Sequence, residues 1–249
     1  MPSNNLIIAQ VTDTHIAPSD VLYRGFKVRQ QFTEVLKKLA KKKLDLLILS
    51  GDLAAYEGEP ESYLWIKEAL STFPHPYIVM PGNHDHVVRM SKVFELDGNE
   101  IAQGMLYFTR KINGKRLIFL DSSMSSISKQ QLEWLSTEIA KSKEQALLFI
   151  HHPPLLCDCL FMDERHALQN HHDVWQVLQT PRQTIKHIFC GHYHTEKTVI
   201  KDGKSVYLTP STVFQIKTDT PEFAIEHSKA GWRMIEWKGR QVQTYVEYL

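Results

Sequence analysis

The sequence predicts an α/β protein in which short buried strands alternate with helices. Strand-like runs recur along the chain, and most are apolar at consecutive positions, as in strands that are buried on both faces. Helical patterns fall between the early runs, and this alternation predicts layers of helix over sheet. The chain has 249 residues and is 43% hydrophobic, which suits one large domain with a substantial core. We therefore expect a single domain over residues 1–249.

The expected strands come from apolar runs that are too short for helices. In chain order they cover residues 6–11, 44–49, 77–80, 117–120, 146–150, 187–190, 206–208, 233–237 and 242–246. The last third of the chain is richer in strand than in helix.

Four helices are expected, at residues 27–43, 60–72, 129–142 and 171–179. In the first, apolar residues recur at the i, i+3, i+4, i+7 and i+8 spacing of one helix face: Phe32, Val35, Leu36, Leu39 and Ala40. The third shows the same pattern, and Ser128 with Gln131 predicts a capping box at its start.

Charge and composition bear on the partners and on the location of the protein. A formal net charge of +1 gives no electrostatic reason to expect nucleic acid or an anionic membrane. No apolar run approaches the roughly 20 residues that span a bilayer. Residues 1–5 show neither a basic region nor a cleavage site, so no signal peptide is expected. An odd, sparse set of cysteines, Cys157, Cys159 and Cys190, fits a reducing compartment, and we expect a cytoplasmic protein.

Five segments place potential metal ligands where apolar runs end: Asp13-Thr14-His15, Gly51-Asp52, Gly82-Asn83-His84-Asp85, His151-His152-Pro153 and Gly191-His192-Tyr193-His194. In open α/β sheets, ligands bind just beyond the carboxyl ends of the strands. Taken alone, each segment is also explained by an ordinary turn or a capping residue. Together they predict a two-metal site that cleaves phosphoesters. Two cations there would bind a phosphate, generate hydroxide from water and stabilise the charge of in-line displacement.

The candidate metal ligands are Asp13, His15, Asp52, Asn83, His151, His192 and His194. Residues i and i+2 of an extended backbone point the same way, so Asp13 and His15 could reach one cation. The two histidines of the last segment could serve two metals separately. A carboxylate can bridge two metals, which makes Asp52 the natural shared ligand, and Gly51 permits a sharp bend before it. His152 would point away from His151 and is expected to be structural or to support a metal ligand without binding the metal itself.

The candidate catalytic residues are His84 and Asp85. His84 is adjacent to the ligand Asn83 and points elsewhere, which leaves it free for proton transfer. Asp85 is expected to fix the tautomer of His84 and to raise its pKa. Residues 155–180 are a candidate cap over the site, and His166 and Asn170 within it are candidates for contact with substrate.

The five segments, in this order, resemble the calcineurin-like metallophosphoesterase superfamily, whose pattern is D-x-H, G-D, G-N-H-D/E, H and G-H-x-H. The match covers residues 13–194, and every motif position is filled. Within the superfamily the chain looks most like the bacterial class III cyclic nucleotide phosphodiesterases, the cyclic-AMP phosphodiesterase group. That likeness also lies in residues 10–15, 120–122, 131–135, 210–212 and 231–233. The resemblance implies a four-layer αββα sandwich of two mixed β-sheets.

The resemblance also implies roles for the site residues. Asp13, His15, Asp52 and His194 would hold one metal, and Asp52, Asn83, His151 and His192 the other. His84 would meet the phosphate and donate a proton, and the implied substrate contacts are His15, Asp52, Asn83, His84 and His194. The cofactors would be two divalent or mixed-valence ions, and mixed oxygen and nitrogen ligands suit Fe, Mn or Zn.

The implied reaction is hydrolysis of a 3′,5′-cyclic nucleotide, cyclic AMP above all, to the 5′-monophosphate. A homodimer is left open. One departure concerns residues 23–28, which lack the small polar pair, Asn-Thr or Asp-Thr, that relatives often carry. If this stretch faces the pocket, the substrate preference differs from that of those relatives.

Two alternatives remain. The same chemistry could act on a glycerophosphodiester, another phosphodiester or a nucleotide-diphosphate lipid. The lipid would call for an apolar cap or a basic membrane-facing patch, and the sequence indicates neither. The second alternative is a non-catalytic scaffold, but such proteins lose metal ligands or the proton donor. Here all seven ligands and His84 are present.

Overall fold

Two mixed β-sheets form the centre of the protein. The computed structural model describes residues 5–19, 21–141, 143–179 and 184–249. The five-stranded sheet has the order β15-β14-β1-β2-β3. Its strands are β1 (Asn5–Val11), β2 (Leu46–Ser50), β3 (Tyr77–Met80), β14 (Gly231–Lys238) and β15 (Gln241–Tyr248). The first three are parallel, and β14 runs antiparallel to both β1 and β15.

The six-stranded sheet has the order β10-β11-β9-β8-β7-β6. Its strands are β6 (Phe108–Ile112), β7 (Lys115–Leu120), β8 (Ala146–Ile150), β9 (Ile185–Cys190), β10 (Lys197–Lys201) and β11 (Lys204–Leu208). The four inner strands are parallel, and the edge strands β6 and β10 are antiparallel to their neighbours. Two short hairpins complete the strands: β4 (Ile101–Ala102) with β5 (Met105–Leu106), and β12 (Gln215–Ile216) with β13 (Ile225–His227).

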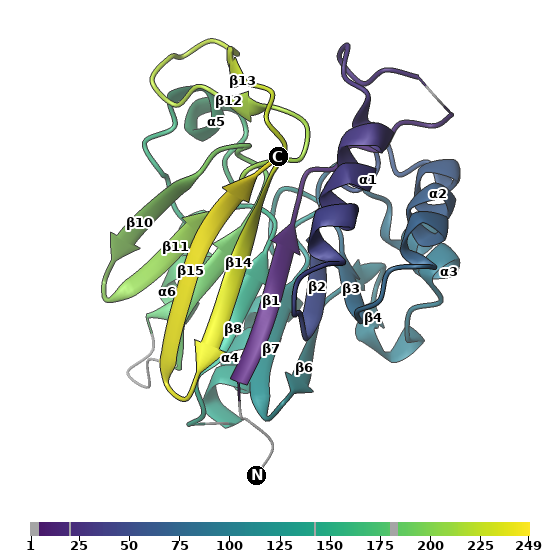
Figure 1. Ribbon diagram of the computed structural model, residues 1–249. Coiled ribbons are helices and arrows are strands. Elements are labelled where there is room, and N and C mark those ends of the chain that lie inside the picture. The colour runs from purple at the N-terminus through teal and green to yellow at the C-terminus, as the bar shows by residue number, and fades with distance from the viewer. Residues whose placement is uncertain (1–4, 20, 142, 180–183) are drawn as a thin grey trace.

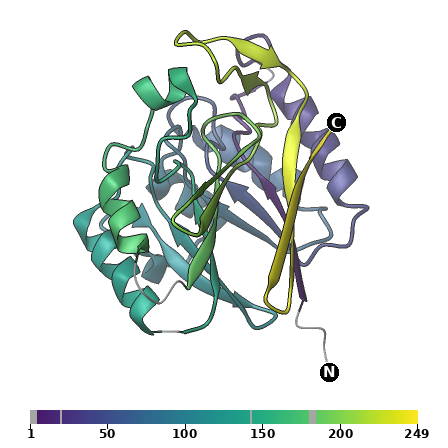
Figure 2. The same ribbon diagram turned by 90° about the vertical axis from the view of Figure 1, so that its left-hand side faces the viewer.

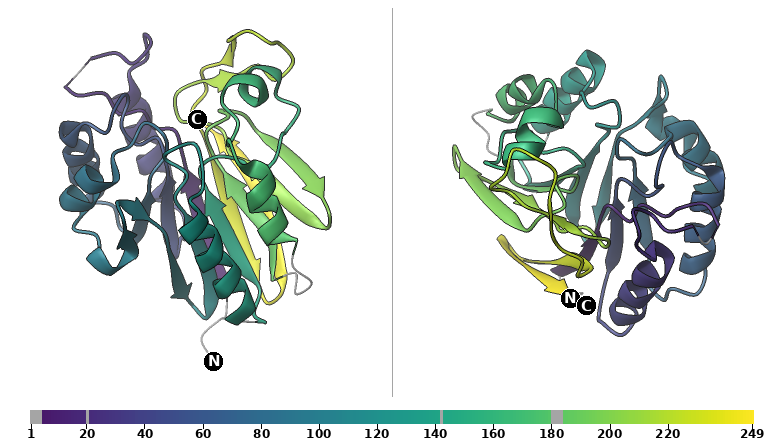
Figure 3. Two further views of the ribbon diagram at one scale, coloured as in Figure 1. Left: turned by 180° about the vertical axis from the view of Figure 1, so that it is seen from behind. Right: turned by 90° about the horizontal axis from the view of Figure 1, so that it is seen from above.

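Helices cover the outer faces of both sheets, which gives the four layers that the resemblance implied. On one side lie α1 (Val28–Leu39), α2 (Pro60–Leu70) and α3 (Val87–Phe94); on the other lie α4 (Lys129–Lys141) and α6 (His171–Leu178). The view from above in Figure 3 shows both sheets between these two sets of helices. The short helices α5 (Leu160–Arg165) and η1 (Gly98–Glu100) lie in connecting segments. The expected αββα sandwich is confirmed.

The core follows from strands that are apolar at every position. All five residues of β2 and all five of β8 are buried. In the second sheet Phe119, Phe149 and Phe189 stack across neighbouring strands, with ring centroids 5.3 and 5.2 Å apart. Strands buried on both faces need this unbroken apolar pattern, which is why the sequence predicted β2 and β8 closely.

Several sequence predictions need correction or lie outside the described residues. The edge strands β6 and β10 carry many polar residues and were not predicted. The backbone N–H of Gln131 donates to Ser128 Oγ at 3.2 Å, but the Gln131 side chain bonds the backbone of Asp121, so the reciprocal half of the capping box is wrong. Residues 1–4, part of the segment in which no signal peptide is expected, lie outside the described residues. So do residue 142, the expected end of a helix, and residue 180, the expected end of the cap.

The carboxyl ends of β1, β2 and β3 point to one end of the sandwich (Figure 1). The helix α5 and the β12–β13 hairpin lie at this same end, as Figures 1 and 2 show from two sides. Along the described part of the chain, no helix is both long and apolar enough to cross a membrane.

Candidate active site

The predicted site residues lie in loops that leave the strands. Asp13 follows β1, Asp52 follows β2, Asn83 follows β3, His151 follows β8 and His192 follows β9. Although these residues are far apart in the sequence, the parallel strands bring their loops to one end of the molecule.

The expected extended backbone in these loops is wrong. Asp13, His15, His192 and His194 have φ angles of 52°, 42°, 66° and 45°, in the left-handed region. The backbone N–H of Asp13 donates to Gly51 O at 3.0 Å, so this loop turns alongside the loop that follows β2. The side chains nevertheless converge, because the turns rather than the strand pleat direct them.

Gly51 allows the close approach that the sequence predicted. The φ angle of Gly51 is +98°, a value that residues with a side chain rarely adopt. A Cβ atom at this position would overlap with the ring of His151. The bend places Asp52 beside His151, with Asp52 Oδ1 3.3 Å from His151 Nε2.

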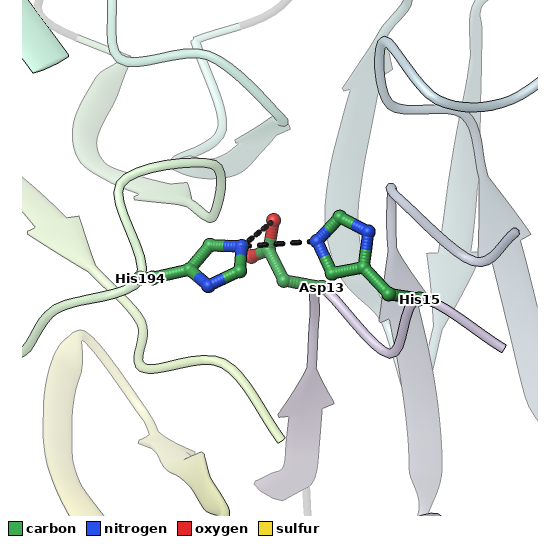
Figure 4. Close-up of side chains that lie close together, drawn as sticks. All are labelled: Asp13, His15 and His194. Atoms are coloured by element: carbon green, nitrogen blue, oxygen red, sulfur yellow. Dashed lines mark hydrogen bonds and ion pairs between the residues drawn. The ribbon is translucent and has the colours of Figure 1, made fainter. Parts of the chain in front are cut away.

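One group of ligand-type side chains consists of Asp13, His15 and His194 (Figure 4). His194 Nε2 lies 3.3 Å from Asp13 Oδ1 and 3.0 Å from His15 Nε2. One donor atom from each residue falls within 4.8 Å of the others, so the three could hold one cation.

A second group consists of Asp52, His151 and His192, again with donor atoms within 4.8 Å of one another. Asp52 also approaches the first group, since its Oδ2 lies 3.9 Å from His15 Nε2. Its two oxygens therefore face both groups, which is the position that a shared ligand would require.

Asn83 Oδ1 and His151 Nε2 are among the buried atoms of this region that have no hydrogen-bond partner in the described part of the chain. Buried polar atoms normally find partners, and an orphan calls for an explanation such as a bound ion. Both atoms are lone-pair donors on residues predicted to hold a metal, so the residues present fit a metal centre.

Backbone carbonyls orient three of the imidazoles: His151 Nδ1 to Ser50 O at 2.9 Å, His194 Nδ1 to Phe214 O at 3.1 Å and His192 Nε2 to His166 O at 2.9 Å. A carbonyl oxygen only accepts, so each of these nitrogens carries the proton. This leaves the opposite nitrogen of each ring as the one that could bind a metal, which is the usual arrangement for a metal-binding histidine.

The charges of the cluster also favour cations. Burial raises the pKa of Asp13, but the neighbouring imidazoles outweigh it and lower the pKa to about 2. Burial lowers the pKa of both His15 and His192 to about 3. Burial also lowers the pKa of His151, but Asp52 and Asp13 raise it to about 9. The negative field that would hold a proton on His151 would equally attract a metal ion.

This arrangement of donors agrees with a family match over residues 6–196, to the calcineurin-like phosphoesterases. The protein belongs to this family. A Fibrobacter succinogenes protein named a probable cyclic nucleotide phosphodiesterase is 38% identical over 248 residues, covering 100% of this chain and 96% of the relative. The 3′,5′-cyclic adenosine monophosphate phosphodiesterase CpdA of Escherichia coli is 30% identical, covering 92% of this chain and 84% of that protein.

Solved structures support the calcineurin-like fold. A dimetal phosphatase from Danio rerio matches with a TM-score of 0.67 and 15% identity, covering 96% of this chain and 98% of that one. The purple acid phosphatase PPD1 from yellow lupin matches with a TM-score of 0.72 and 13% identity, covering 99% of this chain and 52% of that one. At these identities the likeness concerns the fold alone.

Within this calcineurin-like site, His84 and Asp85 differ from expectation. His84 Nδ1 lies 3.1 Å from the carbonyl oxygen of Tyr56. The Asp85 carboxylate instead accepts hydrogen bonds from the backbone N–H groups of Leu53, Ala54 and Gly82 and from the Tyr63 hydroxyl. The expectation that Asp85 orients His84 is therefore wrong, because the oxygens of Asp85 accept hydrogen bonds from the loops after β2 and β3 and from α2.

Two other residues singled out in the sequence, His152 and Asn170, have structural contacts. His152 is structural, as predicted: its Nδ1 lies 2.9 Å from Ser122 Oγ, and its ring centroid lies 3.9 Å from that of His192. Asn170 does not line the pocket. Its side chain bonds both the N–H and the carbonyl of Ile127, at 2.9 and 2.8 Å.

A cavity of about 320 Å³ opens over the cluster. The predicted residues that line it are His15, Asp52, Asn83, His84, His166, His192 and His194. Sequence reasoning missed the other lining residues, which are Tyr23, Arg24, Phe161, Met162, Phe214, Ile216 and Phe223. Phe161, Met162 and His166 come from the candidate cap. Residues 23–28 lack the small polar pair that relatives often carry, and this difference was the signal that could have placed Tyr23 and Arg24 at the cavity.

Proposed function

We propose that the protein hydrolyses 3′,5′-cyclic nucleotides, cyclic AMP among them, to 5′-monophosphates. The observation that carries this proposal is the complete set of donors, with Asp52 between two groups that could each hold a cation. Relatives named cyclic nucleotide phosphodiesterases, aligned over 92–100% of this chain, support the substrate class.

The residues fit a two-metal centre in which Asp13, His15, Asp52 and His194 would hold one ion and Asp52, Asn83, His151 and His192 the other. Iron, manganese and zinc all suit this set of carboxylate, amide and imidazole ligands. When bound, such a pair of ions supplies a water-derived nucleophile at neutral pH and neutralises charge on the phosphoryl oxygens.

In this proposal His84 donates the proton that the leaving 3′-oxygen requires. With Nδ1 at the Tyr56 carbonyl, Nε2 is the ring atom left for exchange with the substrate. Asp85 holds the loop that carries His84 and transfers no proton. His15, Asp52, Asn83, His84 and His194 all line the cavity, so each lies where a bound phosphodiester could meet it.

The test is metal analysis combined with a panel of phosphodiesters. Protein prepared without chelator should hydrolyse cyclic AMP or cyclic GMP to the 5′-monophosphate, and Asp52→Asn should abolish this activity. Exclusive hydrolysis of glycerophosphocholine would move the protein to the glycerophosphodiester alternative. A metal-loaded protein that cleaves none of the panel would support the scaffold alternative.

The cytoplasmic location and the homodimer remain predictions. Among the described residues, Cys157, Cys159 and Cys190 are free and buried, as expected in a reducing compartment. Cell fractionation tests the location, and sedimentation velocity tests the oligomeric state.

A further inference from the structure

Residues 23–26 form a tight turn at the edge of the cavity. Tyr23 and Phe26 exchange two backbone hydrogen bonds, of 3.1 and 2.8 Å. Arg24 and Gly25 between them have φ angles of 48° and 88°. Two central residues with positive φ are the pattern of a type I′ turn, which suits glycine but is disfavoured for arginine. Side chains held in such conformations often serve a site.

Tyr23 fixes this turn against the metal-ligand cluster. Its ring lies nearly parallel to that of His15, with an interplanar angle of 8° and centroids 4.7 Å apart. Tyr23 is 6% exposed, whereas the neighbouring Arg24 is exposed. The turn therefore projects a guanidinium from a rigid base beside the candidate ligand His15.

Arg24 lies near two aromatic side chains of the cavity lining. Its guanidinium carbon lies 5.0 Å from the ring centroid of Phe223 and 5.9 Å from that of Tyr23, and all three residues line the cavity. No carboxylate among the described residues forms an ion pair with Arg24. A guanidinium that faces the ring of Phe223 and has no acidic partner is available to a ligand.

Phe161 and Phe223 form an aromatic wall of the cavity, and backbone hydrogen bonds fix the segments that carry them. Phe161 and Phe223 meet edge to face, with centroids 5.7 Å apart. The backbone of α5 is tied to the loop before β13, since Leu160 N–H donates to Thr218 O at 2.9 Å and Phe161 N–H to Thr220 O at 3.1 Å. A phosphate has no need of such a wall, whereas a flat nucleobase stacks on aromatic and guanidinium planes.

We propose that Arg24, Phe161 and Phe223 form a nucleobase-binding wall that sets substrate preference. This proposal rests on the proposed function, because it assigns the base of the same nucleotide substrate. Arg24 would act by stacking and by its planar fork of donors, both of which lysine lacks.

Two matched substrates test the wall. One is cyclic AMP, and the other is methyl riboside 3′,5′-cyclic phosphate, in which a methoxy group replaces the base. For cyclic AMP, Arg24→Gly and Phe223→Ala should raise KM about tenfold and change kcat less than twofold, since base stacking is worth about 1–3 kcal/mol. Neither variant should change kcat/KM for the base-free substrate. Glycine suits the left-handed turn, so Arg24→Gly removes the side chain and keeps the backbone.

Arg24→Lys and Arg240→Ala are the controls. Arg24→Lys should behave like Arg24→Gly, and Arg240→Ala, at an exposed arginine that does not line this cavity, should behave like the wild type. Equal losses on both substrates, full rescue by lysine, or unchanged kinetics would each overturn the wall.

Binding of adenosine separates this inference from the proposed function, because it requires no hydrolysis. Saturation-transfer NMR should detect adenosine on the wild type and a much weaker signal on Arg24→Gly and Phe223→Ala. If the wild type binds adenosine through these residues but does not hydrolyse cyclic nucleotides, the proposed function is wrong and the nucleobase-binding wall is supported. Equal signals from all three proteins would overturn the wall.

Discussion

His84 is oriented by Tyr56, since its Nδ1 lies 3.1 Å from the Tyr56 carbonyl oxygen. The carbonyl can only accept, so the contact keeps a proton on Nδ1 and leaves Nε2 to exchange with a ligand. The Tyr56 carbonyl belongs to the loop that follows β2. Asp85, the sequence neighbour of His84, instead accepts hydrogen bonds from backbone N–H groups of the loops after β2 and β3. A substitution of His84 should therefore affect proton transfer more than the structure of its loop.

We expect His84→Ala to lower kcat for cyclic AMP by about 10²–10⁴ and to leave the metal content unchanged, because a positioned general acid contributes this much. The loss should shrink with bis-p-nitrophenyl phosphate, whose leaving group needs no proton. The exposed neighbour His86 provides the control variant, His86→Ala. Loss of metal from His84→Ala would show instead that His84 is a ligand, since it also lies in a group with His15 and Asp52.

Asp85→Asn should lower the free energy of unfolding by about 2–4 kcal/mol, because an amide cannot accept all four hydrogen bonds that the carboxylate accepts. Tyr63→Phe removes one of the four, together with the hydrogen bond that the Tyr63 hydroxyl accepts from the His86 N–H, and should cost about 1–3 kcal/mol. Urea unfolding of both variants measures the difference. Asp85→Asn with wild-type stability and greatly reduced kcat would restore the catalytic role that we withdraw.

Asp52→Asn should reduce the metal content from two equivalents to one or fewer, because an amide bridges two cations poorly. Elemental analysis of protein prepared without chelator gives the stoichiometry. Glu133→Gln, at an exposed carboxylate of α4, is the control and should retain two equivalents. Wild-type protein that is fully active with one equivalent would exclude the bridging role.

Removal of metal should also lower thermal stability. Asp13 and Asp52 are almost fully buried, so chelation leaves two carboxylates without a cation between them. At 100 times the dissociation constant, ligand binding stabilises the folded state by about 2.7 kcal/mol per site. Calorimetry should show a lower Tm after chelation, recovery with Mn or Zn, and a smaller shift for Asp52→Asn. An unchanged Tm in wild-type protein shown to be metal-free would contradict this account.

The pair between Glu138 and Arg116 predicts a pH-dependent contribution to stability. Burial raises the pKa of Glu138, but hydrogen bonds from Lys141 and Arg116 outweigh it and lower the pKa. A lowered pKa stabilises the folded state above the unfolded value of about 4.3, and the effect is lost as pH falls through the folded value. Glu138→Gln should cost about 1–2 kcal/mol at pH 7, and the difference from wild type should shrink towards pH 3. A difference independent of pH in urea unfolding would refute the ion pair as its cause.

Much of this fold and many of the site positions could be predicted from the sequence because both depend on local pattern. Strands buried on both faces, such as β2 and β8, are marked by unbroken apolar runs. The sequence also marked the loops that bring Asp52 and His151 together, since these follow directly on such runs.

Other features depend on contacts that no local pattern encodes. The edge strands β6 and β10 are half-exposed and polar, so they resembled loops. Asp85 bonds Leu53 and Ala54, more than thirty residues away, and adjacency to His84 suggested the wrong partner. Phe223 reaches the cavity from an irregular segment, where neither helix nor strand periodicity indicates a direction.

Left-handed backbone is shared by five of the candidate metal ligands, Asp13, His15, Asp52, His192 and His194. Each such residue costs on the order of 1 kcal/mol, and glycine would relieve that strain at every position. In metal-free protein, selection for heat resistance would thus favour glycine over the ligands, whereas in metal-loaded protein the stabilisation by the bound ions would favour keeping them. Without metal, thermal stability and chemistry compete at the same few backbone positions, and metal binding removes that conflict.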